Sequence, residues 1–95
     1  MNNIRPNELG TWIKEQTKPV QLIDVRSRSE FRSGAVEGFV NIPLDEIVSR
    51  SDELNQENPL VIMCMAGSRS MMAARQLEHA GFNDIWNVQG GLMAF

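Results

Sequence analysis

The strongest constraint on the fold is the alternation of short apolar runs with helical patterns along the chain. The runs are rich in β-branched residues and too short for buried helices, so they predict inner strands, at 20–25, 40–43, 60–63 and 85–88. Helical spacing fills the intervals, at 7–17, 44–50 and 69–80, with a short helix after Ser27 ending at Gly34 and another beginning at Leu92. Strands that alternate with helices predict an α/β domain with a parallel sheet and helices on both faces.

Local signals support several of these boundaries. Pro6 stands where the first turn of the first helix would begin. Ser27 and Glu30 have the Ser-x-x-Glu spacing of a capping box, in which the hydroxyl and the carboxylate satisfy backbone amides at a helix start. Gly81 takes the usual place just after the end of the helix at 69–80.

The cysteine and histidine counts narrow the possible chemistry. Cys64 is the only cysteine and His79 the only histidine, which excludes an internal disulfide and a Cys/His metal cluster of the usual ligand count. We therefore expect no metal and no cofactor. Any cysteine chemistry here is the chemistry of one thiol.

The net charge and the lengths of the apolar runs limit which partners and which compartment are expected. Nine basic against twelve acidic side chains give a net charge of −3, so nucleic acid is not an expected partner. No apolar run reaches the ~18 residues of a membrane span, and no basic leader precedes an apolar stretch, so we expect a cytoplasmic protein without a membrane partner. The 95 residues fit a single domain spanning 1–95.

Cys64 lies where a reactive group would be expected. It follows the most apolar predicted strand, and a small loop containing Gly67 leads from it into the next helix. Ligands of open parallel sheets bind at the carboxyl ends of strands, and the free amides and dipole of a helix N-terminus stabilise an anion there. With Arg69 nearby, the thiol pKa should fall from ~8.5 toward or below neutrality, which makes Cys64 a nucleophile and the loop a cradle for an anionic substrate.

Other interpretations of these residues remain open. Cys64 could be a small buried residue at a strand end, but the small residues after it favour a backbone that curls around the sulfur. Asp24 and Arg26 leave a strand at the same edge of the sheet. We favour an arginine–carboxylate brace there, with Glu30 or Glu37 as further partners, over a role in the pocket.

The segment LVIMCMAGSRS at 60–70 strongly resembles the active-site segment of the rhodanese family of sulfurtransferases, in which a strand, a Cys-x-x-Gly-x-Arg-Ser loop and a helix follow one another. Residues 22–31 resemble the family's Asp-Val-Arg segment, 34–43 its Gly-His-Ile-Pro-Gly-Ala segment, and 87–95 its closing Gly-Gly helix. These segments, in order, cover nearly the whole chain.

The resemblance implies a rhodanese-like fold, with a small, mainly parallel sheet of about five strands flanked by helices on both faces, and a persulfide on Cys64. It assigns the backbone cradle to Met65, Ala66, Gly67, Ser68 and Arg69, the cationic side chain to Arg69, and a hydroxyl near the rim to Ser70. Two departures stand out. Ala35 and Glu37 replace the family's usual His and Pro, and the closing helix is expected to be cut short at Phe95, where the family commonly has a Trp.

The function that the resemblance implies is sulfurtransfer by double displacement, from a small anionic donor such as thiosulfate to cyanide or an external thiol, either a small thiol or a dithiol protein. One alternative is a non-catalytic or persulfide-carrying domain in a sulfur relay. A cysteine phosphatase is less favoured, because four residues separate Cys64 from Arg69, whereas the phosphatase loop has five.

Overall fold

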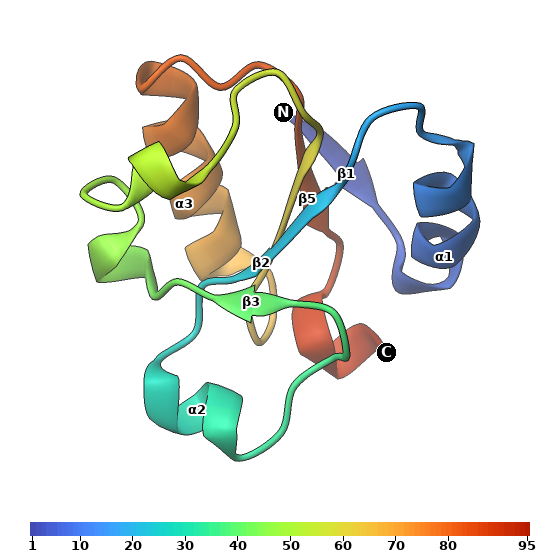
Figure 1. The fold of residues 1–95 in the computed structure, drawn as a ribbon. Coiled ribbons are helices and arrows are strands. Elements are labelled where there is room, and N and C mark those ends of the chain that lie inside the picture. The colour runs from blue at the N-terminus through green and yellow to red at the C-terminus, as the bar shows by residue number, and fades with distance from the viewer.

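The computed structural model describes all 95 residues and contains one five-stranded, all-parallel sheet with strand order β1-β5-β4-β2-β3 (Figure 1). The strands are β1 (Asn2–Ile4), β2 (Gln21–Asp24), β3 (Val40–Asn41), β4 (Leu60–Met63) and β5 (Ile85–Val88). The α-helices are α1 (Pro6–Glu15), α2 (Arg28–Arg32) and α3 (Ser68–His79), and the 3-10 turns are η1 (Leu44–Glu46), η2 (Ser51–Glu53) and η3 (Gly91–Ala94). The predicted α/β class and parallel sheet are confirmed.

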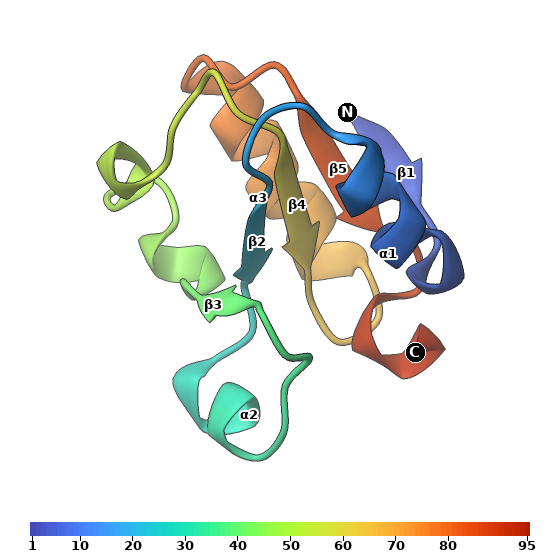
Figure 2. The same cartoon turned by 45° about the vertical axis from the view of Figure 1, so that its right-hand side comes forward.

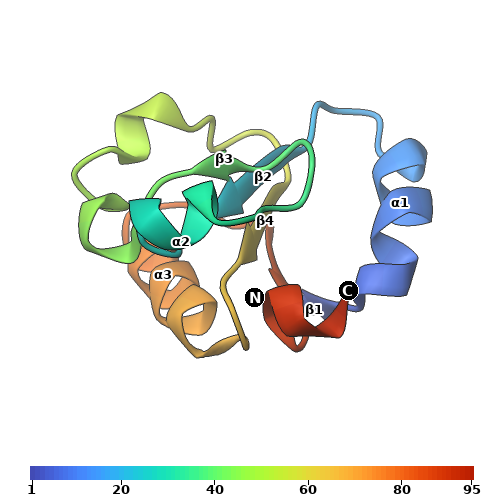
Figure 3. The same cartoon turned by 90° about the horizontal axis from the view of Figure 1, so that it is seen from below.

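Helices cover both faces of the sheet, with α1 on one side and α3 on the other (Figure 3). The central strand β4 shows why its sequence is continuously apolar. Val61 and Met63 belong to the core cluster beneath α1, whereas Leu60 and Ile62 belong to the cluster beneath α3. Because successive side chains of a strand point to opposite faces, a strand covered on both sides needs apolar residues at every position.

The parallel register brings the carboxyl ends of the strands to one edge of the sheet. Asp24 at the end of β2 pairs with Met63 at the end of β4, and Ile62 pairs with Asn87 of β5. Figure 2 shows α2, the loop after β4 and the C-terminal turn gathered at this edge. None of the helices is long and apolar enough to span a bilayer.

Most predicted boundaries hold within a few residues. The capping box of Ser27 and Glu30 is formed at the start of α2. At the end of α3, the amides of Gly81 and Phe82 donate to the carbonyls of Glu78 and Leu77, so Gly81 closes the helix as predicted.

The helix predicted at 44–50 is wrong. The structure has the single 3-10 turn η1 there, with Ile47 fully buried but Val48 half exposed. The Leu44 amide donates to the Val25 carbonyl at 3.0 Å, which ties the start of the segment to the end of β2, and Pro43 has no amide hydrogen to give. The closing helix expected from Leu92 is likewise a 3-10 turn, η3.

The strand β1 was not predicted from the residue pattern. Asn2 and Asn3 are exposed and polar, and only Ile4 is buried. The segment is extended because it pairs with β5, which is remote in sequence. No local residue pattern therefore predicts this strand.

Candidate active site

Cys64 lies immediately after β4, buried to 1% exposure, with its sulfur enclosed by the following loop. The loop turns at Gly67, whose φ of 111° lies in the left-handed region that favours glycine. The Gly67 amide donates to Cys64 Sγ at 3.0 Å. The backbone thus curls around the sulfur, as the small residues of the loop predicted.

Ser70, on the first turn of α3, completes the surroundings of the sulfur. Its Oγ lies 3.4 Å from Cys64 Sγ and 2.9 Å from the Gly67 carbonyl oxygen, and it also contacts Asn87 Oδ1 on β5. Ser70 is fully buried, so this hydroxyl is part of the sulfur's enclosure rather than of the rim that the sequence suggested.

Burial raises the pKa of the Cys64 thiol, but hydrogen bonds outweigh burial and bring the pKa below its ordinary value. These bonds come from the Ser70 hydroxyl and from the amides of Ser70, Gly67 and Ala66. The direction agrees with the prediction from sequence. The cause differs in part from the predicted one: neutral hydrogen-bond donors, rather than the Arg69 guanidinium, lower the thiol pKa.

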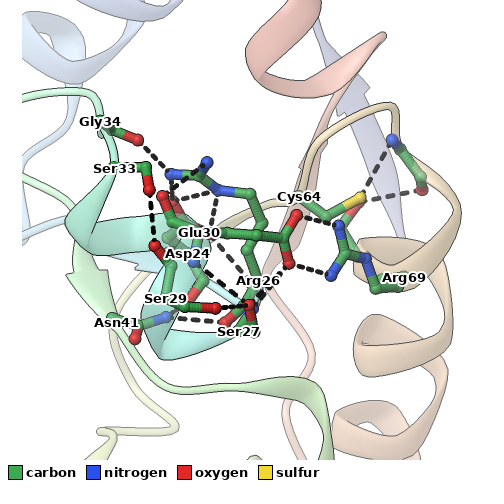
Figure 4. A network of polar contacts seen from close by, with 12 residues as sticks. Asp24, Arg26, Ser27, Ser29, Glu30, Ser33, Gly34, Asn41, Cys64 and Arg69 are labelled. Carbon is green, nitrogen blue, oxygen red and sulfur yellow. Dashed lines mark hydrogen bonds and ion pairs between the residues drawn. The ribbon is translucent and has the colours of Figure 1, made fainter.

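Arg69 is placed differently from the expectation that its charge is available to an anion in the loop. Its Nη1 and Nη2 donate to the two carboxylate oxygens of Glu30, at 2.7 and 2.9 Å (Figure 4). This bidentate pair joins α3 to α2. It raises the pKa of Arg69 and lowers the pKa of Glu30 to about 2.

Glu30 was expected as a further partner of the Asp24–Arg26 brace, but its carboxylate pairs with Arg69, a contact that the sequence did not predict. The capping box predicted its role at the start of α2, where its carboxylate accepts from the Ser27 amide at 3.0 Å. The second role, pairing with Arg69 across 39 positions, has no local signal. The resemblance of residues 22–31 to a family segment was the available hint that this stretch lies near the site.

Asp24 and Arg26 form the brace that the sequence favoured. Arg26 Nη2 lies 2.8 Å from Asp24 Oδ2, and both side chains are at most 2% exposed. Arg26 also donates to the carbonyl oxygens of Gly34 at 2.7 Å and Glu30 at 3.4 Å. Glu37 is exposed and takes no part.

A hollow of about 560 Å³ opens beside the loop. Its walls include Arg26, Ser29, Glu30, Ser33, Met65 and Leu92. Met65 is partly exposed there, while Ala66 and Ser68 are exposed. Glu30 thus lies in the same lining as Met65, the residue that follows Cys64.

The C-terminal turn η3 holds the loop from the other side. The amides of Leu92 and Met93 donate to the carbonyls of Cys64 and Met65, at 2.8 and 3.1 Å. Gly91 lies so close that a Cβ atom there would stand 2.5 Å from the Cys64 carbonyl oxygen, so only glycine fits.

Comparison with known proteins gives consistent results. A family model described as a Rhodanese-like domain matches residues 6–95. The thiosulfate sulfurtransferase GlpE of Shewanella oneidensis is 30% identical over 80 residues, which cover 84% of this chain and 79% of that protein. A rhodanese-like domain protein from Staphylococcus aureus has a crystal structure that matches with a TM-score of 0.87 and 34% identity, covering 99% of this chain and 90% of that one.

A putative sulfur carrier protein of Bacillus subtilis, YrkF, is 36% identical over 78 residues, or 82% of this chain. The chain spans 42% of the length of YrkF and 59% of the length of YqhL, another Bacillus subtilis relative. Similar sequences therefore occur both as nearly whole proteins and as parts of longer ones.

Proposed function

The chain belongs to the rhodanese-like domain family, whose relatives include sulfurtransferases and a sulfur carrier, and we propose that it transfers sulfane sulfur through a persulfide on Cys64. One observation carries this proposal. Backbone amides and the Ser70 hydroxyl converge on a single buried thiol and lower its pKa, at the edge of the sheet where ligands of parallel α/β folds bind. A thiolate held in this way is a nucleophile.

The reaction needs two displacements at sulfur. The Cys64 thiolate attacks the outer sulfur of a donor, the donor's S–S bond breaks, and the leaving group departs with the bonding electron pair, as sulfite from thiosulfate or as a thiolate from a persulfide. An acceptor thiolate or cyanide then attacks the outer sulfur of the persulfide, and Cys64 is released as thiolate. Both leaving groups are stable anions, so no side chain has to protonate them.

The acceptor in this scheme is external. The chain has one cysteine, so no second thiol of its own can discharge the persulfide. A small thiol or a dithiol protein fits this role, in a reducing compartment such as the cytoplasm. A carrier domain that hands its sulfur to a larger assembly uses the same first step, and the carrier relative YrkF favours this as the second candidate.

Intact-mass measurement after exposure to sulfane donors tests the proposal. We expect the wild-type protein to gain one sulfur atom, cyanide or an added thiol to remove it, and Cys64→Ser to abolish the gain while circular dichroism shows a retained fold. Catalytic turnover with a small acceptor indicates a free enzyme, and loading without turnover indicates a carrier. No gain from any donor, with or without hydrolysis of an aryl phosphate, would overturn the proposal.

A further inference from the structure

The charged side chains around the candidate site are paired with one another. Asp24 neutralises Arg26, and Glu30 neutralises Arg69 through both of its carboxylate oxygens. The positive field at the sulfur therefore comes mainly from backbone amides and one hydroxyl. A guanidinium beside an anion site normally supplies a charge-assisted hydrogen bond to the ligand, but here a carboxylate of the same chain already receives it.

This pairing disfavours a dianionic donor. Thiosulfate carries two negative charges and must approach a thiolate, so three negative charges meet at the site. The hollow beside the loop offers a dianion no unpaired cation, because Arg26 and Glu30 are the only charged residues in its lining and Arg26 is paired with Asp24. Arg69 keeps further N–H donors, but Glu30 already compensates its charge, so a dianion gains less from it than from an unpaired guanidinium.

We infer that the site prefers a sulfane donor with at most one negative charge, such as an alkyl persulfide, over thiosulfate, and that Glu30 is the residue that sets this preference. The inference rests on the proposed function above. The hollow suits the organic part of such a donor, because Met65 and Leu92 give it apolar walls and Ser29 and Ser33 offer hydroxyls.

The chemical step balances without any further reactant. The Cys64 thiolate attacks the outer sulfur of R–S–SH, a new S–S bond forms at Cys64, and the S–S bond of the donor breaks. R–S⁻ leaves with the electron pair of that bond. The proton stays on the transferred sulfur, giving Cys64–S–SH. One negative charge enters the step on Cys64 and one leaves on the thiolate product, so no additional cation is needed.

Glu30→Gln is the informative variant. Glutamine keeps the size of the side chain and can still complete a capping box with Ser27, but it removes the charge that occupies Arg69. The matched control is Ser27→Ala, which removes the capping hydroxyl and leaves the Glu30 carboxylate on Arg69. The control separates disturbance of α2 from the release of Arg69.

The experiment measures kcat/KM for thiosulfate and for cysteine persulfide, whose net charge is at most −1, with the same acceptor, in the wild type and both variants. We expect the wild type to favour the persulfide. We expect Glu30→Gln to raise the thiosulfate-to-persulfide ratio of kcat/KM about tenfold to a hundredfold, the effect of one charge-assisted hydrogen bond, and Ser27→Ala to leave the ratio unchanged. Adding Arg69→Gln to Glu30→Gln should remove the gain.

Two failures can be told apart. If neither donor loads sulfur onto the wild-type protein, the proposed function itself fails. If both donors load it but the ratio is the same in the wild type and in a folded Glu30→Gln variant, the assignment of donor preference to Glu30 is overturned. If the wild type favours thiosulfate, the preference itself is overturned. In both cases the proposed function stands.

Discussion

Two of the arginine–carboxylate pairs of the molecule lie beside the candidate site, and they have opposite characters. Asp24 and Arg26 are two positions apart at the end of β2, and their side chains are almost wholly excluded from solvent. Glu30 and Arg69 are 39 positions apart, join two helices, and are each about one-third exposed. Breaking the first pair leaves a buried charge without a partner, which lowers the stability of the protein strongly. Opening the second pair changes the stability little, because water solvates the separated charges. The same two functional groups thus form a brace in one place and an adjustable contact in the other.

Breaking the buried pair should have the largest effect. Asp24→Asn removes the charge that compensates a buried guanidinium, and we expect the free energy of unfolding to fall by about 3–5 kcal/mol. Urea denaturation followed by far-UV circular dichroism measures the loss. The double variant Asp24→Leu/Arg26→Met removes both charges and should be more stable than Asp24→Asn. A single variant that lost less than about 1 kcal/mol would contradict the assignment of this pair as a brace.

The next largest effect concerns the pKa of Cys64, which we expect to depend more on the neutral donors at the sulfur than on Arg69. Ser70→Ala removes a hydroxyl that stabilises the thiolate, and we expect the pKa of Cys64 to rise. Arg69→Gln should raise it less. The pH dependence of the alkylation rate gives both values. A larger shift in Arg69→Gln than in Ser70→Ala would mean that the guanidinium, despite Glu30, is the main stabiliser of the thiolate.

The exposed pair itself should contribute little to stability. A double-mutant cycle with Glu30→Gln and Arg69→Gln should give a coupling free energy of about 0.2–1 kcal/mol, measured by urea denaturation. The coupling should shrink further in 1 M salt, where exposed charges are screened. A value of 3 kcal/mol or more would place the pair with the buried brace and would make it a poor candidate for rearrangement.

The smallest effect is the acid dependence of this pair. The pKa of Glu30 is about 2 in the folded protein, below the ~4.3 of a free glutamate. The ionised carboxylate therefore adds stability above about pH 4.3, and this contribution is lost as the pH falls through about 2. The difference in unfolding free energy between the wild type and Glu30→Gln should accordingly vanish toward pH 2. A difference that stayed constant over this range would mean that the charge of Glu30 is not what stabilises the contact.

The sequence predicted the parts of the site that are continuous in the chain. The strand β4, Cys64, the glycine turn and α3 are one segment, and each boundary has a local cause in apolar patterning or backbone freedom. The capping box of Ser27 and Glu30 was predicted for the same reason. The brace of Asp24 and Arg26 followed from two residues leaving one strand.

Contacts made by folding were not accessible to the same reasoning. The pairing of Glu30 with Arg69 depends on how α2 packs beside α3, and the extension of Asn2–Ile4 depends on β5. The turn at Leu44 depends on the Val25 carbonyl that its amide reaches. In each case the partner that determines the structure is remote in sequence, so the local spacing of residues does not predict the contact.

The position of β5 in the sheet has a consequence for how the protein is made on the ribosome. β5 lies between β1 and β4 although it is the last strand to be synthesised, so β1 has no strand to pair with until residues 85–88 have emerged. The carbonyls of Cys64 and Met65 receive their hydrogen bonds from Leu92 and Met93 later still. A nascent chain that exposes Cys64 therefore lacks the hydrogen bonds from η3 that hold the loop around the sulfur. We expect the thiol pKa to fall only after residues 91–94 have been synthesised.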